Sequence, residues 1–166
     1  MNGSALPETA LIIDDDEQVR GLLGGILEYQ QGLSVVYAGS GAEARELVRN
    51  GSYCLCLCDI GLPDCSGLDL ARELVELGRD IAVLIVTGQD SAALGEQALA
   101  FGAYGYVVKP FRANELLVAV RGALRRRELA IAERQRHAEL EEMVRERTAE
   151  LHRSREETVK RLAAAI

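Results

Sequence analysis

Five short apolar runs alternate with longer amphipathic stretches over the first 111 of the 166 residues. Apolar runs of this length bounded by turn residues are typical of buried strands, and apolar residues repeated every three to four positions are typical of helices. The strands are predicted at residues 10–13, 33–37, 53–58, 81–86 and 104–108, and the helices at 17–29, 41–50, 68–77 and 91–101. This alternation predicts an α/β fold, a doubly wound five-stranded parallel sheet with helices on both faces.

The pattern changes after Pro110. Residues 113–166 contain no proline and one glycine, Gly122, and are rich in Ala, Leu, Glu and Arg. They predict one helix of about 50 residues, which at 1.5 Å per residue is about 75 Å long and cannot pack wholly on a small domain. Its first turns carry the apolar residues that would cover the sheet, namely Leu116, Leu117, Val120 and Leu124.

Mostly apolar residues recur every seven positions along this helix, in two different phases. The first phase comprises Leu124, Ile131 and Ala138, and the second comprises Val144, Leu151 and Thr158. Arg147 and Ser154 fall near the seam, so the heptad is imperfect. We expect a parallel two-stranded coiled coil with a phase shift, and the alternative is a solitary or frayed helix. The predicted division is an N-terminal extension at 1–8, a globular domain at 9–125 and a coiled-coil helix at 126–166.

Charge differs between the two regions. Residues 1–111 hold 16 Asp and Glu against 6 Lys and Arg, a net charge of −10, whereas residues 112–166 hold 10 against 13, a net charge of +3. The acidic region repels nucleic acid and suits a site for cations, and the second region has neither a helix-turn-helix nor a marked basic face, so this chain is not expected to bind nucleic acid. No apolar run approaches the roughly 20 residues that cross a bilayer, and the N-terminus lacks a signal peptide, so a cytoplasmic protein without membrane attachment is expected.

Four cysteines lie close together in the sequence. Cys54, Cys56 and Cys58 alternate along a predicted strand, so we expect them on one face as small buried hydrophobes of a reducing compartment. Their spacing does not match the C-x-x-C loops of zinc sites. Cys65 follows in a turn region, and for this residue a redox role is left open as an alternative.

A lone carboxylate, Asp59, ends the third apolar run, just before the turn sequence Ile-Gly-Leu-Pro-Asp. The first run leads into Asp14 and Asp15, and because the carboxyl ends of parallel strands meet at one edge of a sheet, the three carboxylates are expected in one pocket. Clustered oxygen ligands suit Mg²⁺, which takes one or two carboxylates and keeps several waters. Asp16 and Glu17 are instead expected to cap the following helix.

A hydroxyl and an ammonium are predicted at the same edge. Thr87 ends the fourth run, and Lys109 follows the fifth. A phosphoryl group on Asp59 would need such partners, because Thr87 can donate a hydrogen bond to it and Lys109 can neutralise its charge. Each residue alone is ambiguous, since a lysine before proline is usually on the surface and a threonine that closes a strand is usually structural. Their joint occurrence at four strand ends predicts phosphoryl transfer.

Four segments carry a resemblance to a known family. They are residues 12–20 (IIDDDEQVR), 58–67 (CDIGLPDCSG), 86–88 (VTG) and 106–111 (YVVKPF). In combination they resemble the receiver domain of bacterial two-component response regulators, over residues 9 to about 125. The resemblance implies a flavodoxin-like sheet with strand order 2-1-3-4-5.

The resemblance also implies roles for the acidic residues. Asp59 would accept a phosphoryl group from a phosphohistidine of a sensor histidine kinase or phosphotransfer protein, or from acetyl phosphate. Asp15 would bind Mg²⁺ directly and Asp14 largely through water. Asp59 and the backbone carbonyl of Gly61 would complete the protein ligands.

Three further residues take their expected roles from the same family. Thr87 and Lys109 would contact the phosphoryl group, and Tyr106 would be the switch aromatic that swings inward as Thr87 moves. Gly61 and Gln89 occupy the positions that tune water access to the acyl phosphate. Gly61 offers no side-chain shield, so we expect an unhindered water path on that side.

The C-terminal helix resembles linkers between receivers and output domains. Residues 140–151 look like signalling helices, and residues 154–166 are similar to the helix that enters HD-GYP phosphodiesterase domains, which degrade cyclic di-GMP. The helix has no stop signal, so we expect an N-terminal fragment of a longer regulator that transmits its state through a dimeric helix to an absent output domain. His137 and His152 are expected to be solvated rather than to bind metal.

Other classes of protein are less favoured by the sequence. The chain is expected to be no enzyme beyond its own phosphorylation, while the parent protein could be a cyclic di-GMP phosphodiesterase. A small-molecule aspartyl-phosphate hydrolase is disfavoured because such enzymes usually have a second carboxylate just after the nucleophile, where this chain has Ile60 and Gly61. The receiver of a DNA-binding or kinase-linked regulator is a further alternative.

Overall fold

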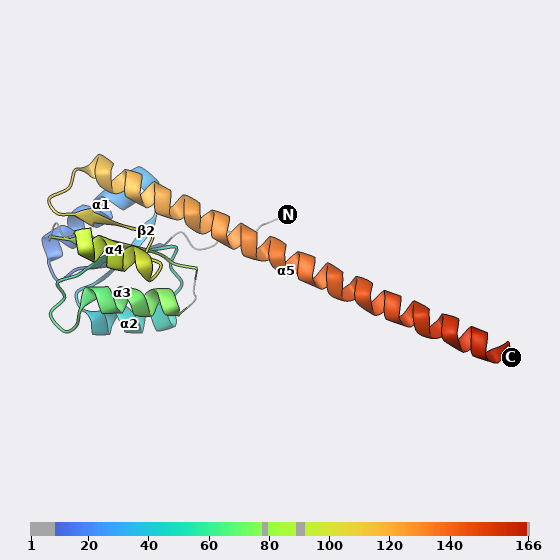
Figure 1. Cartoon of the computed structure of the whole chain (residues 1–166). Coiled ribbons are helices and arrows are strands. Elements are labelled where there is room, and N and C mark those ends of the chain that lie inside the picture. The colour runs from blue at the N-terminus through green and yellow to red at the C-terminus, as the bar shows by residue number, and fades with distance from the viewer. Residues whose placement is uncertain (1–8, 78–79, 89–91, 166) are drawn as a thin grey trace. The chain divides into compact units, whose positions relative to one another are not determined.

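The structure is a computed structural model that describes residues 9–77, 80–88 and 92–165. The predicted extension at 1–8, Gln89 and the predicted helix start at Ser91 lie outside these residues. The strands are β1 (Thr9–Ile13), β2 (Ser34–Ala38), β3 (Leu55–Asp59), β4 (Ala82–Thr87) and β5 (Gly105–Val108). They form one parallel sheet in the order β2-β1-β3-β4-β5, which confirms the predicted fold. The colours of Figure 1 follow the chain through these elements from the N-terminus to the long C-terminal helix.

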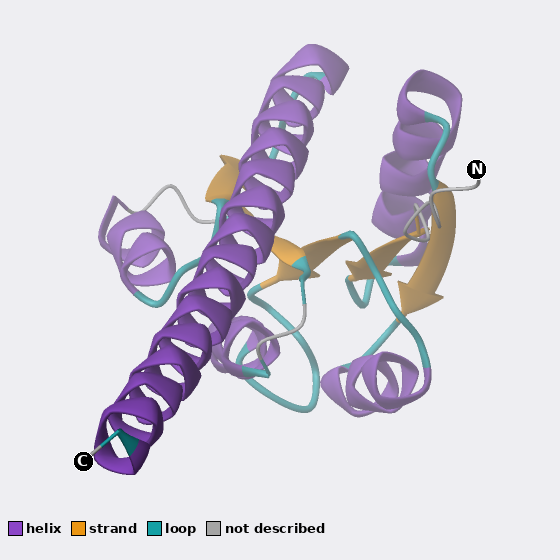
Figure 2. Ribbon diagram, turned by 90° about the vertical axis from the view of Figure 1, so that its right-hand side faces the viewer, coloured by secondary structure: helices purple, strands orange, loops and turns teal. Residues whose placement is uncertain are grey.

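Helices cover both faces of the sheet. They are α1 (Glu17–Gln31), α2 (Gly41–Asn50), α3 (Gly67–Glu76), α4 (Ala92–Ala100) and α5 (Ala113–Ala164). One apolar core holds side chains of α2, α3 and α4, and the other holds side chains of α1 and the first turns of α5. The strands therefore lie between two helical layers (Figure 2).

The sequence explains why β3 and β4 are central. Every residue of LCLCD in β3 and of AVLIVT in β4 is buried, because both faces of each strand are covered. One prediction about this region was wrong: Cys56 and Cys58 pack in the core beside α2 and α3, but Cys54 packs in the other core. The strand begins only at Leu55, so the alternation of faces does not extend to Cys54.

Short polar residues start the helices. Asp16 is the N-cap of α1, and its carboxylate accepts hydrogen bonds from the backbone N–H groups of Gln18 (2.8 Å) and Val19 (3.3 Å), as its predicted capping role requires. Ser40 and Ser66 cap α2 and α3 in the same way. These caps set where the loops at the carboxyl edge of the sheet end.

The chain forms two compact units, residues 1–127 and 128–166, which are described separately. In the first unit, Leu116 and Val120 of α5 are buried on the sheet, and the Arg127 guanidinium donates to the Asp80 backbone carbonyl. The second unit is the rest of α5, whose 52 residues confirm the predicted long helix. The coiled coil stays a prediction. Among residues 9–77, 80–88 and 92–165, no helix has the length and apolar composition needed to cross a membrane.

Candidate functional site

Three carboxylates meet at the carboxyl edge of the sheet. Asp59 is the last residue of β3, and Asp14 and Asp15 directly follow β1. Ile13 is paired with Cys58 in the parallel register, so the two strand ends lie side by side. Oxygen atoms of the three carboxylates lie within 4.8 Å of one another, with Asp14 1% and Asp59 8% exposed and Asp15 exposed. The structure thus brings the predicted acidic residues together.

Lys109 joins two of these carboxylates. Its Nζ lies 2.6 Å from Asp14 Oδ2 and 3.0 Å from Asp59 Oδ1. Burial disfavours the charged ammonium, but the hydrogen bonds with Asp14 and Asp59 and their negative charge outweigh it, so the pKa of Lys109 is raised above its usual 10.5. The ammonium offsets part of the repulsion among the three carboxylates.

Backbone contacts fix the position of Asp14. Its Oδ1 accepts a hydrogen bond from the backbone N–H of Asp16 at 3.0 Å, and its own backbone N–H donates to the Ala38 carbonyl at 3.1 Å. The Arg20 guanidinium donates to the Asp14 carbonyl at 2.5 Å. Arg20 was not predicted as part of the site. Its place one turn into the helix that follows the acidic residues is the only sequence signal that could have indicated it.

The loop after Asp59 turns back close to the strand. The Gly61 backbone N–H donates to Asp59 Oδ2 at 3.0 Å. A Cβ on Gly67 would lie 1.8 Å from the Asp59 carbonyl oxygen, so only glycine fits where α3 begins. Gly67 was not among the predicted site residues, although a glycine at the end of the turn sequence is a signal of close backbone approach.

Thr87 and Tyr106 come from the other two strand ends. Thr87 is 3% exposed, ends β4 opposite Val108, and its carbonyl accepts a hydrogen bond from the Lys109 backbone N–H at 2.7 Å. Tyr106 in β5 is 41% exposed, and its ring lies where a Cβ on Gly95 of α4 would be only 2.4 Å away. Tyr106 therefore rests against the backbone of α4.

The donor atoms fit a divalent cation. Three carboxylates against one ammonium leave an excess of negative charge, and all the clustered donors are oxygens, which are the ligands Mg²⁺ prefers. The predicted ligands Asp14, Asp15 and Asp59 are thus in one place, and Gly61 adjoins Asp59 through its N–H.

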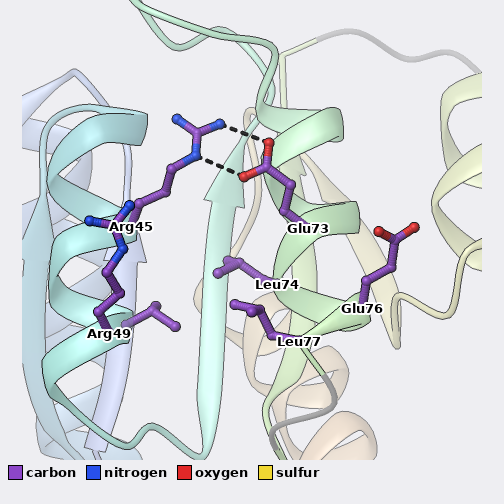
Figure 3. Close-up of a pocket in the computed structure, with 7 residues that line it drawn as sticks. Arg45, Arg49, Glu73, Leu74, Glu76 and Leu77 are labelled. Carbon is purple, nitrogen blue, oxygen red and sulfur yellow. Dashed lines mark hydrogen bonds and ion pairs between the residues drawn. The ribbon is translucent and has the colours of Figure 1, made fainter.

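A separate hollow of about 370 Å³ lies between α2 and α3 (Figure 3). The Arg45 guanidinium and the Glu73 carboxylate face each other across it in a two-pronged ion pair, with distances of 2.7 and 2.9 Å. This pair raises the pKa of Arg45 and lowers the pKa of Glu73. None of the acidic site residues lines this hollow, so it does not extend the site. The Arg45–Glu73 ion pair beside it joins α2 to α3.

The cysteines have the character of core residues. Cys54, Cys56 and Cys58 are buried, and burial raises the pKa of Cys56 to about 12. Cys65 is half-buried, and burial and the Asp64 carboxylate raise the pKa of its thiol, which Arg45 offsets only in part. A raised pKa is the opposite of what a reactive thiol needs.

Sequence comparison finds a family over most of the chain. The response regulator receiver domain matches residues 10–121. The chain is 38% identical over 115 residues to the uncharacterized transcriptional regulatory protein YkoG of Bacillus subtilis, covering 69% of this chain and 50% of that protein. It is 36% identical over 121 residues to the response regulator MprA of Mycobacterium sp. strain KMS, covering 73% and 52%. The chain thus spans about half the length of these curated relatives.

Solved structures give the same result. A CheY-like receiver domain protein from Methanospirillum hungatei superposes with a TM-score of 0.69 and 30% identity, covering 76% of this chain and 99% of that one. These comparisons give no support to the resemblance of residues 154–166 to an HD-GYP entry helix.

Proposed function

Because the chain belongs to the response regulator receiver family, whose members take phosphoryl groups from histidine kinases, we propose that Asp59 is the residue that accepts the phosphoryl group here. The observation that supports this most is the contact of Asp59 with Lys109 at 3.0 Å beside Asp14 and Asp15. Asp59 lies at the carboxyl edge of a parallel sheet, where ligands bind in folds of this type. Its 8% exposure leaves the carboxylate within reach of a donor.

Lys109 and Thr87 would stabilise the transferred group. The Lys109 ammonium already contacts Asp59, so it can follow the new negative charge when a phosphoryl group is added. The Thr87 hydroxyl, at the end of the neighbouring strand, can donate to a phosphoryl oxygen after a small movement. Both residues act through charge and hydrogen bonding rather than as nucleophiles.

Mg²⁺ is the proposed cofactor. Asp14, Asp15, Asp59 and the Gly61 carbonyl would hold it. When bound, the cation neutralises negative charge on the acidic residues and on the incoming phosphoryl group. Burial of Asp14 and its contact with the Asp16 N–H keep one ligand fixed before the cation binds.

Tyr106 is the proposed readout of phosphorylation. Movement of Thr87 toward the phosphoryl group frees space beside β4, and the Tyr106 ring then leaves Gly95 and turns inward. The change is passed to α5, which would join two copies of the chain and lead to an output domain. The partner is a sensor histidine kinase or phosphotransfer protein, and an HD-GYP-type hydrolase is the sequence-based hypothesis for the output.

Acetyl phosphate labelling tests the acceptor. The wild-type chain with Mg²⁺ should gain one phosphoryl group by intact-mass measurement, and Asp59→Asn should gain none. Asp69→Asn is the matched control because Asp69 is an exposed carboxylate in the first turn of α3. Labelling of Asp59→Asn at the wild-type level would overturn the assignment, and labelling that survives EDTA would overturn the role of the cation.

A further inference from the structure

A five-residue motif recurs along α5 with a period of 11. The sequence Arg-x-x-Glu-Leu occurs at residues 125–129 (RRREL), 136–140 (RHAEL) and 147–151 (RTAEL). A fourth copy at 158–162 (TVKRL) keeps only the leucine. This period differs from the seven-residue phases expected from Leu124 and Val144.

The repeat places its leucines on one side of the helix. At 100° per residue, 11 residues turn the helix through three full turns plus about 20°, so successive leucines lie almost in line. The row spans about 50 Å, from Leu129 to Leu162, at 1.5 Å per residue. The four side chains are 53%, 51%, 66% and 64% exposed at positions 129, 140, 151 and 162.

The charges of the repeat are paired within it. Arg147 and Glu150 form an ion pair of 3.2 Å, and both belong to the repeat that ends in Leu151. The same i,i+3 spacing places Arg136 beside Glu139 on the helix surface. The repeats at 136–140 and 147–151 therefore each contribute one positive and one negative charge beside their leucine, so two copies at the same level bring balanced charges together there, whereas the repeat at 125–129 has three arginines and one glutamate.

Two hollows lie beside Leu151 on the surface of the helix. One hollow of about 210 Å³ is lined by Thr148, Leu151, His152 and Arg155, and another of about 370 Å³ by Arg147, Glu150, Leu151 and Ser154. In each set the four residues are spaced i, i+3, i+4 and i+7. That is the four-residue hole into which a side chain of a facing helix inserts in a coiled coil.

We propose that the leucine row of residues 129–162 pairs with the same row of a second copy of this chain, parallel and in register. This inference rests on the proposed dimer through α5. It adds the 11-residue period of the contacts and the alignment of the two helices. Apart from the half-buried Ala130 and Ile131, residues 129–162 are exposed, so the row is open to a second copy along its length. Since 11 residues in three turns is 3.67 residues per turn, slightly above 3.6, the pair supercoils weakly to the right rather than to the left.

Cysteine cross-linking of the full chain tests the register. In a Cys65→Ser background, Leu129→Cys and Leu162→Cys should each form a disulfide between like positions on mild oxidation, at least about tenfold more than Ile131→Cys, which the 11-residue period turns to the opposite side. The seven-residue phase through Leu124 and Ile131 predicts the opposite result, with more disulfide in Ile131→Cys than in Leu129→Cys. Glu146→Cys, also turned away from the row, is the control for random collision.

The outcomes separate this inference from the proposed dimer and from the acceptor assignment. A chain that is monomeric by light scattering at all concentrations overturns both the dimer and the register. A dimer that cross-links through Ile131→Cys but not Leu129→Cys overturns the 11-residue register alone. Cross-links between Leu129→Cys and Leu162→Cys in a mixed sample show an antiparallel pair and also overturn it. Acetyl phosphate labelling of Asp59 does not depend on any of these three outcomes, so it tests the acceptor assignment separately.

A disruptive variant provides a second test. Leu140→Glu combined with Leu151→Glu should shift the dimer to monomer. The dissociation constant of the dimer should rise by at least about a hundredfold. Glu146→Gln combined with Glu157→Gln changes the other side of the helix and should leave the dimer intact. Acetyl phosphate labelling of both variants should match the wild type, which shows that the receiver still folds. A dimer that persists unchanged in the leucine variant would contradict the proposal.

Discussion

The Lys109 ammonium lies 2.6 Å from the Asp14 carboxylate, which is 1% exposed. The same ammonium contacts Asp59 at 3.0 Å, so one cation offsets two buried acids. Removing one partner of such a group leaves the other charge buried without compensation, which costs more than the pair itself contributes. The acidic site is therefore held together by a residue far away in the sequence.

Lys109→Met should destabilise the protein at neutral pH. We expect a loss of about 2 kcal/mol, less than for a fully enclosed pair because the Lys109 side chain is 24% exposed. Lys160→Met, in the exposed part of α5, should change stability by less than about 0.5 kcal/mol. Urea unfolding followed by circular dichroism measures both. Equal effects of the two substitutions would contradict the role of Lys109.

The Lys109 contacts also predict a pH dependence at the alkaline side. The pKa of Lys109 is raised in the folded state, so its stabilising contribution is fully present below the unfolded value of about 10.5 and is lost as pH rises through the folded value. The stability difference between wild type and Lys109→Met should therefore shrink above about pH 10.5. A difference that stays constant up to pH 11.5 in urea titrations would argue against this linkage.

Gly67→Ala should be among the most damaging single substitutions. The added Cβ would lie 1.8 Å from the Asp59 carbonyl oxygen, and backbone cannot yield there without moving Asp59. We expect a loss of about 3 kcal/mol and slower labelling by acetyl phosphate. In α1, Gly21 has nothing within 4 Å of an added Cβ, so Gly21→Ala should instead stabilise by about 0.5 to 1 kcal/mol. Thermal unfolding of both variants gives the comparison.

Gly61→Arg should lengthen the lifetime of phosphorylated Asp59. A Cβ at this position would lie 3.3 Å from Asp59 Oδ2, so a long side chain starts beside the acyl phosphate and can cover the path of attacking water. No positive φ is recorded at Gly61, so the backbone accepts a side chain there. Dephosphorylation followed by mass spectrometry should be several-fold slower than in Gly61→Ala. An unchanged lifetime would sink the idea of an open water path.

Gly95→Ala should push the Tyr106 ring away from α4. The added Cβ would be 2.4 Å from a ring carbon of Tyr106, so the exposed ring position becomes unfavourable. If the inward ring accompanies phosphorylation, linkage requires that acetyl phosphate label this variant faster than wild type. Gly122→Ala, where nothing lies within 4 Å, is the control. Tyrosine NMR would report the ring movement directly, and an unmoved Tyr106 signal would count against the coupling.

Much of the fold and of the site could be predicted from the order of residues. Apolar runs that end in Asp59 and Thr87 define strands whose carboxyl ends share an edge, so their meeting follows from the parallel topology alone. Arg20 and Gly67 could not be predicted in this way. Their roles depend on distances between elements: the Arg20 guanidinium lies 2.5 Å from the Asp14 carbonyl, and a Cβ on Gly67 would collide with the Asp59 carbonyl. The hydrophobic period of the sequence does not encode such distances.

Local pattern also failed at a strand boundary. Cys54, Cys56 and Cys58 alternate in sequence, but the strand begins at Leu55, so Cys54 packs in the opposite core. Cys54 is still hydrogen-bonded to Thr9 (2.9 Å) and Ala82 (3.0 Å) of the neighbouring strands, but the chain bends at Cys54, and this bend turns its side chain to the other face. Side-chain alternation holds only inside the regular strand, Leu55–Asp59.

The sequence by itself determined the alternation of strands and helices, the acidic edge and the long C-terminal helix, because hydrophobic periods and strand-end residues are local signals that parallel topology converts into positions. The strand order followed from the family resemblance and not from these periods. Only the tertiary structure decided that Lys109 neutralises Asp14 and Asp59 together, that Tyr106 lies on Gly95, and that Asp59 needs Gly67 beneath its carbonyl. These contacts join residues from separate elements, and their distances depend on how tightly the layers pack.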